Sequence, residues 1–219
     1  MKIDSLIITL FTLGMLGFSG CVDAFKKEEK ITKVLLAGKA NEMYHKLSEE
    51  YFIEGNYTGA LENDLKQLKE DLKYYPDVSA EIAVDYNNIG LDHAKLKEYQ
   101  KALEFYTKVR QIDEVVFDRR DSKKATTVYN MASAYEGLND NLNALKFYQQ
   151  SLALDVNKEQ ILLTHEDIAR VYEKQNNLNQ ALSSYKASLA LRHKLHDKKA
   201  LETLRLEETI ALLSQKLKK

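Results

Sequence analysis

The stretch IGLDHAKLKEYQKALEFY (89–106) decides the fold, because its pattern of small residues recurs along the chain. The bulky apolar residue Ile89 is followed directly by the small residue Gly90, and another small residue, Ala102, comes twelve positions later. Two helices approach each other closely only where neither carries a bulky side chain. The spacing therefore predicts a pair of closely packed helices.

The pattern repeats at a nearly constant interval. The small residues of successive pairs are 42, 42, 37 and 42 positions apart, the pairs being Leu47-Ser48, Ile89-Gly90, Met131-Ala132, Ile168-Ala169 and Ile210-Ala211. Each of the first four pairs is followed twelve positions later by an alanine: Ala60, Ala102, Ala144 and Ala181. A fixed period of this length indicates stacked helical hairpins, an architecture that usually provides a surface for binding other proteins.

Composition agrees with a helical, folded protein. Apolar residues make up 44% of the 219 residues and charged residues 30%, which is ordinary for a globular fold. Eight glycines and one proline leave few helix breakers. The 32 basic residues are balanced by 33 acidic ones, whereas a nucleic-acid-binding protein would show a basic excess. We therefore expect no nucleic-acid partner.

The N-terminal sequence MKIDSLIITLFTLGMLGFSGC (1–21) has the layout of a secretory signal peptide. Lys2 is followed by an apolar segment from Leu6 to Phe18, then by two small residues and the single cysteine, Cys21. Phe18-Ser19-Gly20-Cys21 resembles the lipobox of bacterial lipoproteins. That resemblance implies cleavage before Cys21 and acylation of its sulfur and of the new amino terminus. Several acyl chains would anchor the protein stably in a membrane.

Two alternatives to the lipoprotein interpretation remain open. The uncharged run from Ser5 to Val22 is just long enough to span a membrane uncleaved. However, four lysines follow it within 26–33 and only Lys2 precedes it, so the repeats would then be cytoplasmic. The other alternative is a thiol in an ordinary cleaved signal region. With one cysteine, no disulfide joins parts of this chain.

The four units resemble tetratricopeptide repeats, which are helix-turn-helix units with small residues at positions 8 and 20 and aromatic residues at positions 11 and 24. Two departures stand out: Asp64 replaces the position-24 aromatic of the first unit, and His93 replaces the position-11 aromatic of the second. The 42-residue spacing and the segments DYNNIG (85–90) and VYNMAS (128–133) resemble the kinesin-light-chain variety of the repeat. We expect the chain to reverse at Gly55, Lys97, Asn139 and Asn176, because glycine and asparagine are typical of helix ends.

These features predict an all-α fold: a right-handed α-solenoid of about four tetratricopeptide hairpins with a C-terminal capping helix. The expected divisions are a lipoprotein signal peptide (1–20), a lipidated cysteine with a short linker or helix (21–37), four repeat units (38–196) and the cap (197–219). The units are expected at 38–76, 77–118, 119–156 and 157–196. In the cap, Leu206, Ile210, Leu213 and Leu217 lie at helical spacing, and Ile210-Ala211 repeats the bulky-small pair.

No motif for catalysis or cofactor binding is found in the sequence. A phosphate-binding loop, a dinucleotide fingerprint, a nucleophile elbow and a zinc-protease helix are all missing. His193 and His196 would share a helix face, but no third ligand is evident and neighbouring basic residues would repel a metal ion. We therefore expect no enzymatic activity, no cofactor and no metal.

The resemblance to tetratricopeptide repeats implies a binding groove lined by the first helix of each unit. Carried over by position, the groove residues are Asn87, Asn88, Tyr129, Asn130, Ser133 and Arg170. In related proteins, asparagine at the position of Asn88 and Asn130 holds the backbone of an extended peptide, since a carboxamide both donates and accepts hydrogen bonds. The family's carboxylate clamp is absent, because Val84 and Thr126 replace its basic residues. These polar residues could equally be solvated groups without a ligand.

The sequence thus predicts a membrane-anchored scaffold or assembly factor of the bacterial envelope that binds extended protein segments in its groove. In a Gram-negative cell it would face the periplasm from the outer membrane; otherwise it would lie on the outer face of the cell membrane. A regulator that senses a peptide or small ligand is one alternative, and an envelope enzyme is another. The sequence leaves the partner, the pathway and the oligomeric state open.

Overall fold

The computed structural model describes residues 42–118, 121–155, 157–195 and 200–218. The chain divides into two compact parts, residues 1–43 and 44–219. In the first part, Glu42 and Met43 are described; both are helical and exposed. The predicted signal peptide, Cys21 and the linker to residue 37 lie outside the described residues. The fold below is therefore that of residues 44–219.

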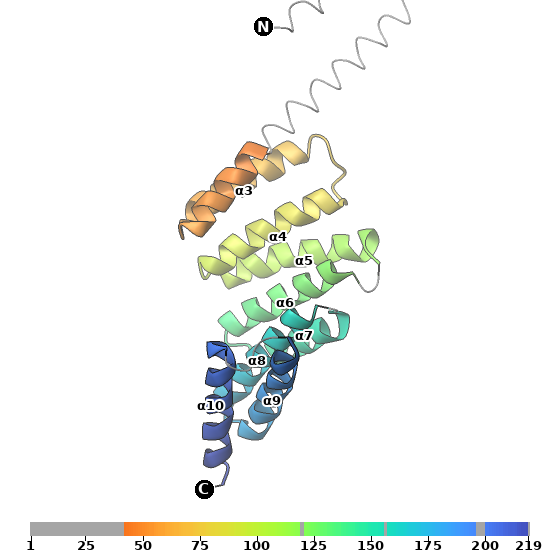
Figure 1. Ribbon diagram of the computed structural model, residues 1–219. Coiled ribbons are helices and arrows are strands. Elements are labelled where there is room, and N and C mark those ends of the chain that lie inside the picture. The colour runs from red at the N-terminus through yellow and green to blue at the C-terminus, as the bar shows by residue number, and fades with distance from the viewer. Residues whose placement is uncertain (1–41, 119–120, 156, 196–199, 219) are drawn as a thin grey trace, which may run out of the picture. The chain divides into compact units, whose positions relative to one another are not determined.

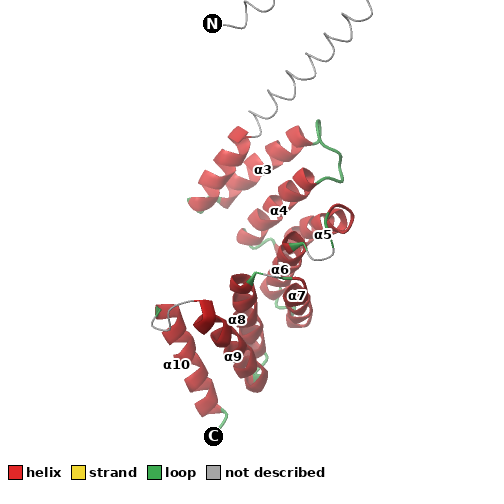
Figure 2. Cartoon of the chain, turned by 45° about the vertical axis from the view of Figure 1, so that its right-hand side comes forward, coloured by secondary structure: helices red, strands yellow, loops and turns green. Residues whose placement is uncertain are grey.

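Every regular element among the described residues is a helix (Figures 1 and 2). Residues 44–53 form the first helix of this part of the chain. The helices after it are α3 (Tyr57–Asp71), α4 (Ala80–Lys95), α5 (Tyr99–Val116), α6 (Ser122–Gly137), α7 (Asn141–Leu154), α8 (Lys158–Lys174), α9 (Leu178–Leu195) and α10 (Leu201–Lys216).

The helices pack in chain order, each against the next. The most extensive contacts join α4 to α5, α6 to α7 and α8 to α9, which are the hairpins that the repeat predicts. Smaller contacts join α3 to α4, α5 to α6, α7 to α8 and α9 to α10, and α4 also touches α6. Packing that is mostly between helices adjacent in the sequence is typical of a repeat protein, and the predicted all-α solenoid is confirmed.

The turns within the hairpins have the same backbone geometry in every unit. Gly55, Lys97, Asn139 and Asn176 have φ angles of 78°, 62°, 60° and 57°. After each one, a backbone N–H reaches back to a carbonyl of the preceding helix, as Glu98 N does to His93 O at 2.8 Å. A left-handed residue of this kind ends a helix and reverses the chain. The predicted turn positions are therefore confirmed, even at Lys97, where the side chain makes this conformation unfavourable.

Five of the helices begin after a residue whose side chain accepts a backbone hydrogen bond. Asn56 accepts from Gly59 N at 3.1 Å, Asp140 from Asn143 N at 3.1 Å and Ser79 from Ile82 N at 3.3 Å. Asp121 and Asn157 cap α6 and α8 in the same way. Each cap satisfies a donor that the helix itself leaves unpaired.

Small residues lie where the paired helices approach most closely, as predicted. Ala60, Ala102, Ala144 and Ala181 are completely buried, as are Ala132 and Ala169. At Gly90, an added Cβ would lie 2.6 Å from the Tyr106 ring. The core follows from this contact, since Tyr106 and Tyr148 are buried together with Met131, Val128 and Ile168 in one cluster.

The C-terminal helix departs from the repeat pattern in one respect. Helix α10 packs against α9 through Thr203, Leu206 and Leu213, which confirms a closing helix. Ala211 is exposed, unlike the small residues of the earlier pairs. A small residue is buried at this position only when a further helix packs against it, and none follows α10 in the described residues. In the described part of the chain, no helix combines the length and apolar character needed to cross a membrane.

Candidate interaction groove

The first helices of successive units are joined side by side by polar contacts. The Nδ2 of Asn130 on α6 donates a hydrogen bond to Oδ1 of Asn87 on α4 at 2.9 Å. The hydroxyl of Tyr129 donates to Oδ2 of Asp167 on α8 at 2.6 Å. These contacts place residues of α4, α6 and α8 on one surface, as the repeat resemblance implies.

A network around Glu136 forms the charged part of this surface. Arg170 binds both carboxylate oxygens of Glu136, at 2.9 and 3.0 Å, and the ammonium of Lys174 lies 2.7 Å from Oε1. The hydroxyl of the buried Tyr148 donates a hydrogen bond to Oε2 of Glu136 at 3.0 Å. Arg170 also pairs with Asp167 at 2.7 Å. Such two-point pairing holds the guanidinium in one orientation.

Burial and pairing have opposite effects on the acidic groups of the network. Burial acts to raise the pKa of Glu136, but hydrogen bonds from Arg170 and Lys174 outweigh it and lower that pKa to about 2. Asp167 differs, because burial dominates over Tyr129 and Arg170 and raises its pKa. Glu136 is therefore a fixed negative charge at neutral pH. Arg170 and Lys174 nevertheless stay about half exposed, so both can also contact a ligand.

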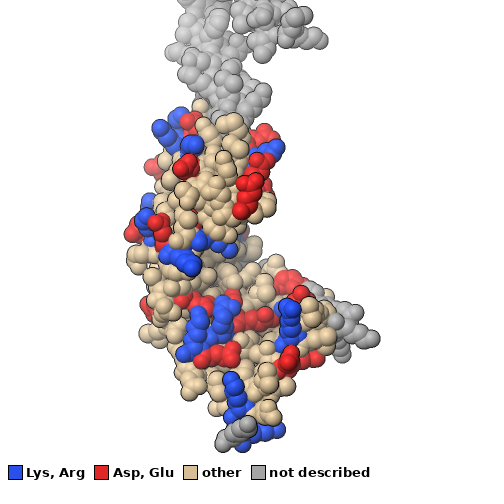
Figure 3. Space-filling model, turned by 90° about the vertical axis from the view of Figure 1, so that its left-hand side faces the viewer, with Lys and Arg blue, Asp and Glu red and all other residues tan. Residues whose placement is uncertain are grey.

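A cavity of about 380 Å³ lies on this surface between α4, α6 and α8. Asn130, Ser133 and Arg170 line it, and the sequence predicted all three as groove residues. Lys95 and Lys174 add positive charge beside Glu136, and Leu91 and Tyr99 contribute apolar wall. Basic and acidic side chains are also interleaved, without dominance of either sign, on the face shown in Figure 3.

The other predicted groove residues lie elsewhere. Asn88 lines a smaller cavity next to residues of the first unit. Asn87 borders an apolar cavity between α4, α5 and α6. Tyr129 is half buried, with its hydroxyl on Asp167. The six residues thus belong to one surface but not to one pocket, and their role in binding stays a prediction.

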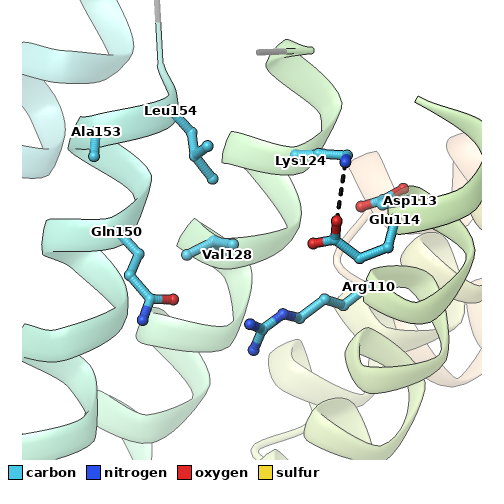
Figure 4. A pocket seen from close by; sticks show the side chains of 8 residues that line it. All are labelled: Arg110, Asp113, Glu114, Lys124, Val128, Gln150, Ala153 and Leu154. Carbon is cyan, nitrogen blue, oxygen red and sulfur yellow. Dashed lines mark hydrogen bonds and ion pairs between the residues drawn. The ribbon is translucent and has the colours of Figure 1, made fainter. Parts of the chain in front are cut away.

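A separate cavity of about 340 Å³ lies between α5, α6 and α7 (Figure 4). Lys124 on α6 pairs with Glu114 on α5 at 3.1 Å along one side, and Arg110 extends toward the middle. Its remaining walls include Val128, Gln150 and Leu154. The lysine at this cavity is thus already paired within the protein, and part of the cavity wall is aliphatic.

The histidine pair singled out in the sequence does not form a visible site. His193 contacts Glu207 of α10 at 3.0 Å, and His196 lies outside the described residues. Among the described residues, no group of three or more histidine, cysteine or acidic side chains is placed to hold a metal ion.

A pair of buried acids beside the first repeat was not predicted from the sequence. Asp64 on α3 and Asp92 on α4 are 3% and 1% exposed, and their carboxyl groups are hydrogen-bonded to each other. A second pair, Asp71 and Asp85, joins the same two helices. One signal was available in the sequence, since Asp64 stands where the other units have tyrosine.

Comparison with known proteins identifies the repeats. Two family models described as tetratricopeptide repeat match residues 80–155 and 164–199. No curated protein matches the chain.

Several solved structures share the fold. A putative kinesin light chain of Podosopora anserina with nearly identical TPR-like repeats has a TM-score of 0.68 at 16% identity, covering 80% of this chain and 85% of that one. BtubC (BKLC) from P. vanneervenii has a TM-score of 0.66 at 17% identity, covering 71% of this chain and 64% of that one. MamA protein has a TM-score of 0.56 at 16% identity, covering 81% and 82%. At these identities the likeness concerns the fold.

Proposed function

Because the chain carries tetratricopeptide repeats, we propose that it is a protein-interaction scaffold that binds an extended segment of another protein along α4, α6 and α8. The observation that carries this proposal is the 380 Å³ cavity lined by Asn130, Ser133 and Arg170. It combines carboxamide, hydroxyl and charged groups with apolar wall, which suits a peptide better than a flat surface would. The family-model match and the related structures support a repeat scaffold.

The hydrogen bond between Asn87 and Asn130 leaves capacity for a ligand. A carboxamide has two N–H donors and an acceptor oxygen, and the contact with Asn87 uses one donor of Asn130. The other groups of Asn130 can bind the N–H and C=O of a passing peptide backbone. Arg170 and Lys174, held by Glu136, then select acidic or polar side chains of that segment.

Photo-crosslinking from the groove tests the scaffold function. A photoreactive residue in place of the exposed Ser133 is expected to crosslink a defined partner, whereas one in place of the exposed Gln149 on α7 is not. With that partner purified, Asn88→Ala combined with Asn130→Ala is expected to weaken binding about tenfold or more, because each lost hydrogen bond contributes about 1 kcal/mol.

The control for this experiment is Gln149→Ala, which also removes a carboxamide from an α-helix, but at an exposed position outside the groove. It should leave affinity unchanged. Wild-type affinity in the Asn88→Ala, Asn130→Ala double variant, for every crosslinked partner, would rule out the groove as the binding surface.

We further propose that Cys21 is acylated and anchors the scaffold to a bacterial envelope membrane. The support is the sequence Phe18-Ser19-Gly20-Cys21 after an apolar segment. In a bacterial host, the wild-type chain is expected to incorporate labelled palmitate and to enter the detergent phase on phase partition. Cys21→Ser should remain unlabelled and migrate as the larger, uncleaved precursor, while Val22→Ala should behave as wild type. Migration of both wild type and Cys21→Ser as the uncleaved precursor, with no palmitate in either, would instead indicate an uncleaved membrane span.

A further inference from the structure

The first repeat contains a cavity at the place where each later repeat contains a tyrosine. Sixteen residues after the small residue of each later unit stands a tyrosine: Tyr106, Tyr148 and Tyr185. Tyr106 fills the space against Gly90 so tightly that an added Cβ would touch its ring. In the first unit the corresponding residue is Asp64, facing Ser48. An aspartate is much smaller than a tyrosine, and a cavity of about 180 Å³ lies between these helices.

Two carboxyl groups line this cavity and are incompletely hydrogen-bonded. Asp64 accepts a hydrogen bond from Ser48, and its carboxyl group lies beside that of Asp92. Oδ1 of Asp64 and Oδ2 of Asp92 have no hydrogen-bond partner among the described residues, although both side chains are almost completely buried. A buried acceptor without a donor is unfavourable by about 1–3 kcal/mol. The site therefore gains stability from a ligand that supplies donors.

The walls of the cavity restrict what that ligand can be. Phe52 and Leu91 provide apolar surface, while Asn88 and the exposed His45 lie on the groove side. Small apolar walls above two acidic groups fit an aliphatic chain that ends in a cation. A metal ion is disfavoured, because no suitable group of three or more ligands occurs among the described residues.

We propose that this cavity receives a lysine side chain of the bound protein segment, with the methylene chain against Phe52 and Leu91 and the ammonium between Asp64 and Asp92. The ammonium supplies three N–H donors, which can satisfy both unpaired oxygens. This inference rests on the proposed groove function and specifies a residue that the partner must contain.

The charged groups around the site favour a cation. Besides Asp64 and Asp92, Glu49 lines the cavity. The second acidic pair, Asp71 and Asp85, is close enough for Asp64 to raise the pKa of Asp85. His45 is the basic group that lines the cavity, and it interacts with Asp64. Lys95 lies over the Phe52 ring, 5.7 Å from its centroid, and is not part of the cavity lining.

Lysine binding should release a proton. Burial and the hydrogen bond to Asp64 raise the pKa of Asp92 to about 8, and burial also raises the pKa of Asp64. At pH 7 the carboxyl group of Asp92 therefore holds a proton when the cavity is empty. An ammonium placed between them favours both ionised forms, so that proton passes to the buffer.

The test uses the full chain and two small probes, Nα-acetyl-lysine amide and Nα-acetyl-norleucine amide. The lysine probe is expected to bind at least tenfold more tightly and to release close to one proton per molecule at pH 7. Calorimetry in two buffers of different ionisation enthalpy measures that proton release. Equal binding of the two probes, or no proton release by the wild type, would overturn the proposal.

Matched variants locate the effect. Asp92→Asn keeps the shape of the side chain and should lower the affinity for the lysine probe at least tenfold and abolish proton release. Asp64→Tyr, which restores the residue of the other units, should exclude the probe. Asp85→Asn removes the same group from the other buried pair, outside the cavity lining, and should retain probe binding. Loss of binding in Asp85→Asn but not in Asp92→Asn would contradict the assigned position.

The experiments distinguish a failure of the lysine cavity from a failure of the groove. The probes bind without any protein partner, so their binding survives even if crosslinking from position 133 captures nothing. Conversely, a partner that crosslinks at position 133 and binds Asp92→Asn as tightly as wild type would refute the lysine pocket and leave the scaffold function standing.

Discussion

Gly90→Val is expected to destabilise the protein by about 3 kcal/mol or more, which is the upper part of the usual range for overfilling a packed core. A Cβ at this position would lie 2.6 and 2.8 Å from Cε1 and Cδ1 of the Tyr106 ring. Tyr106 is 1% exposed and packed into the main core cluster, so moving the ring away from an added side chain would disrupt that packing. The gain from replacing a helical glycine is about 1 kcal/mol at most and does not compensate.

The midpoint of urea unfolding, followed by circular dichroism, measures this effect. The control is Ala211→Val, which adds the same branched side chain at the corresponding small residue of α10. Because Ala211 is exposed, its replacement should change stability by a few tenths of a kcal/mol. Equal effects of the two substitutions would show that the helices are not in close contact at Gly90.

The second large effect is a loss of stability as the pH rises from 6 to 9. Burial, followed by the neighbouring Asp71, raises the pKa of Asp85 from 3.8 to about 8, and burial with the hydrogen bond to Asp64 raises that of Asp92 to about 8. The folded state thus binds protons that the unfolded chain has already released above pH 4. This stabilisation is complete at low pH and disappears as the pH passes 8.

The expected magnitude follows from linkage. Each extra proton bound by the folded state changes the free energy of unfolding by about 1.4 kcal/mol per pH unit. Two such groups with a folded pKa near 8 lower the free energy of unfolding by about 2 to 5 kcal/mol between pH 6 and pH 9. Burial also raises the pKa values of Asp113 and Asp167, so both groups favour the folded state at the lower end of their titration. His165, whose pKa burial lowers, acts in the opposite direction below its ordinary value of 6.5.

Chemical unfolding at pH 6, 7, 8 and 9 tests this prediction. The Asp85→Asn, Asp92→Asn double variant should lose most of the slope and be more stable than wild type at pH 9. Asp77→Asn combined with Asp118→Asn makes the same charge change at exposed positions and should leave the slope unchanged. A wild-type slope in the Asp85→Asn, Asp92→Asn variant would assign the pH dependence to other groups.

The repeat architecture was readable from the sequence alone, because it depends on local spacing. The small residues predict where the helices approach each other closely. All four are buried in the structure: Gly90, Ala102, Ala132 and Ala144. The turns at Lys97 and Asn139 follow from the same period, even though lysine is an unusual residue for a left-handed turn. A pattern of twelve and 42 residues is enough to predict these features, since neighbouring hairpins supply nearly all the contacts.

The polar contacts across units were decided by tertiary structure. That Arg170 would bind Glu136, or that Asn130 would bind Asn87, depends on how far adjacent helices are rotated about their axes, which a residue's position in the repeat does not specify. The same holds for Ala211, whose exposure depends on whether another helix follows α10. Asp64 was recognisable in the sequence as a departure from the aromatic pattern. Its pairing with Asp92, and the cavity beside them, exist only because α3 and α4 pack with these two carboxyl groups in register, away from water, where neither can ionise freely.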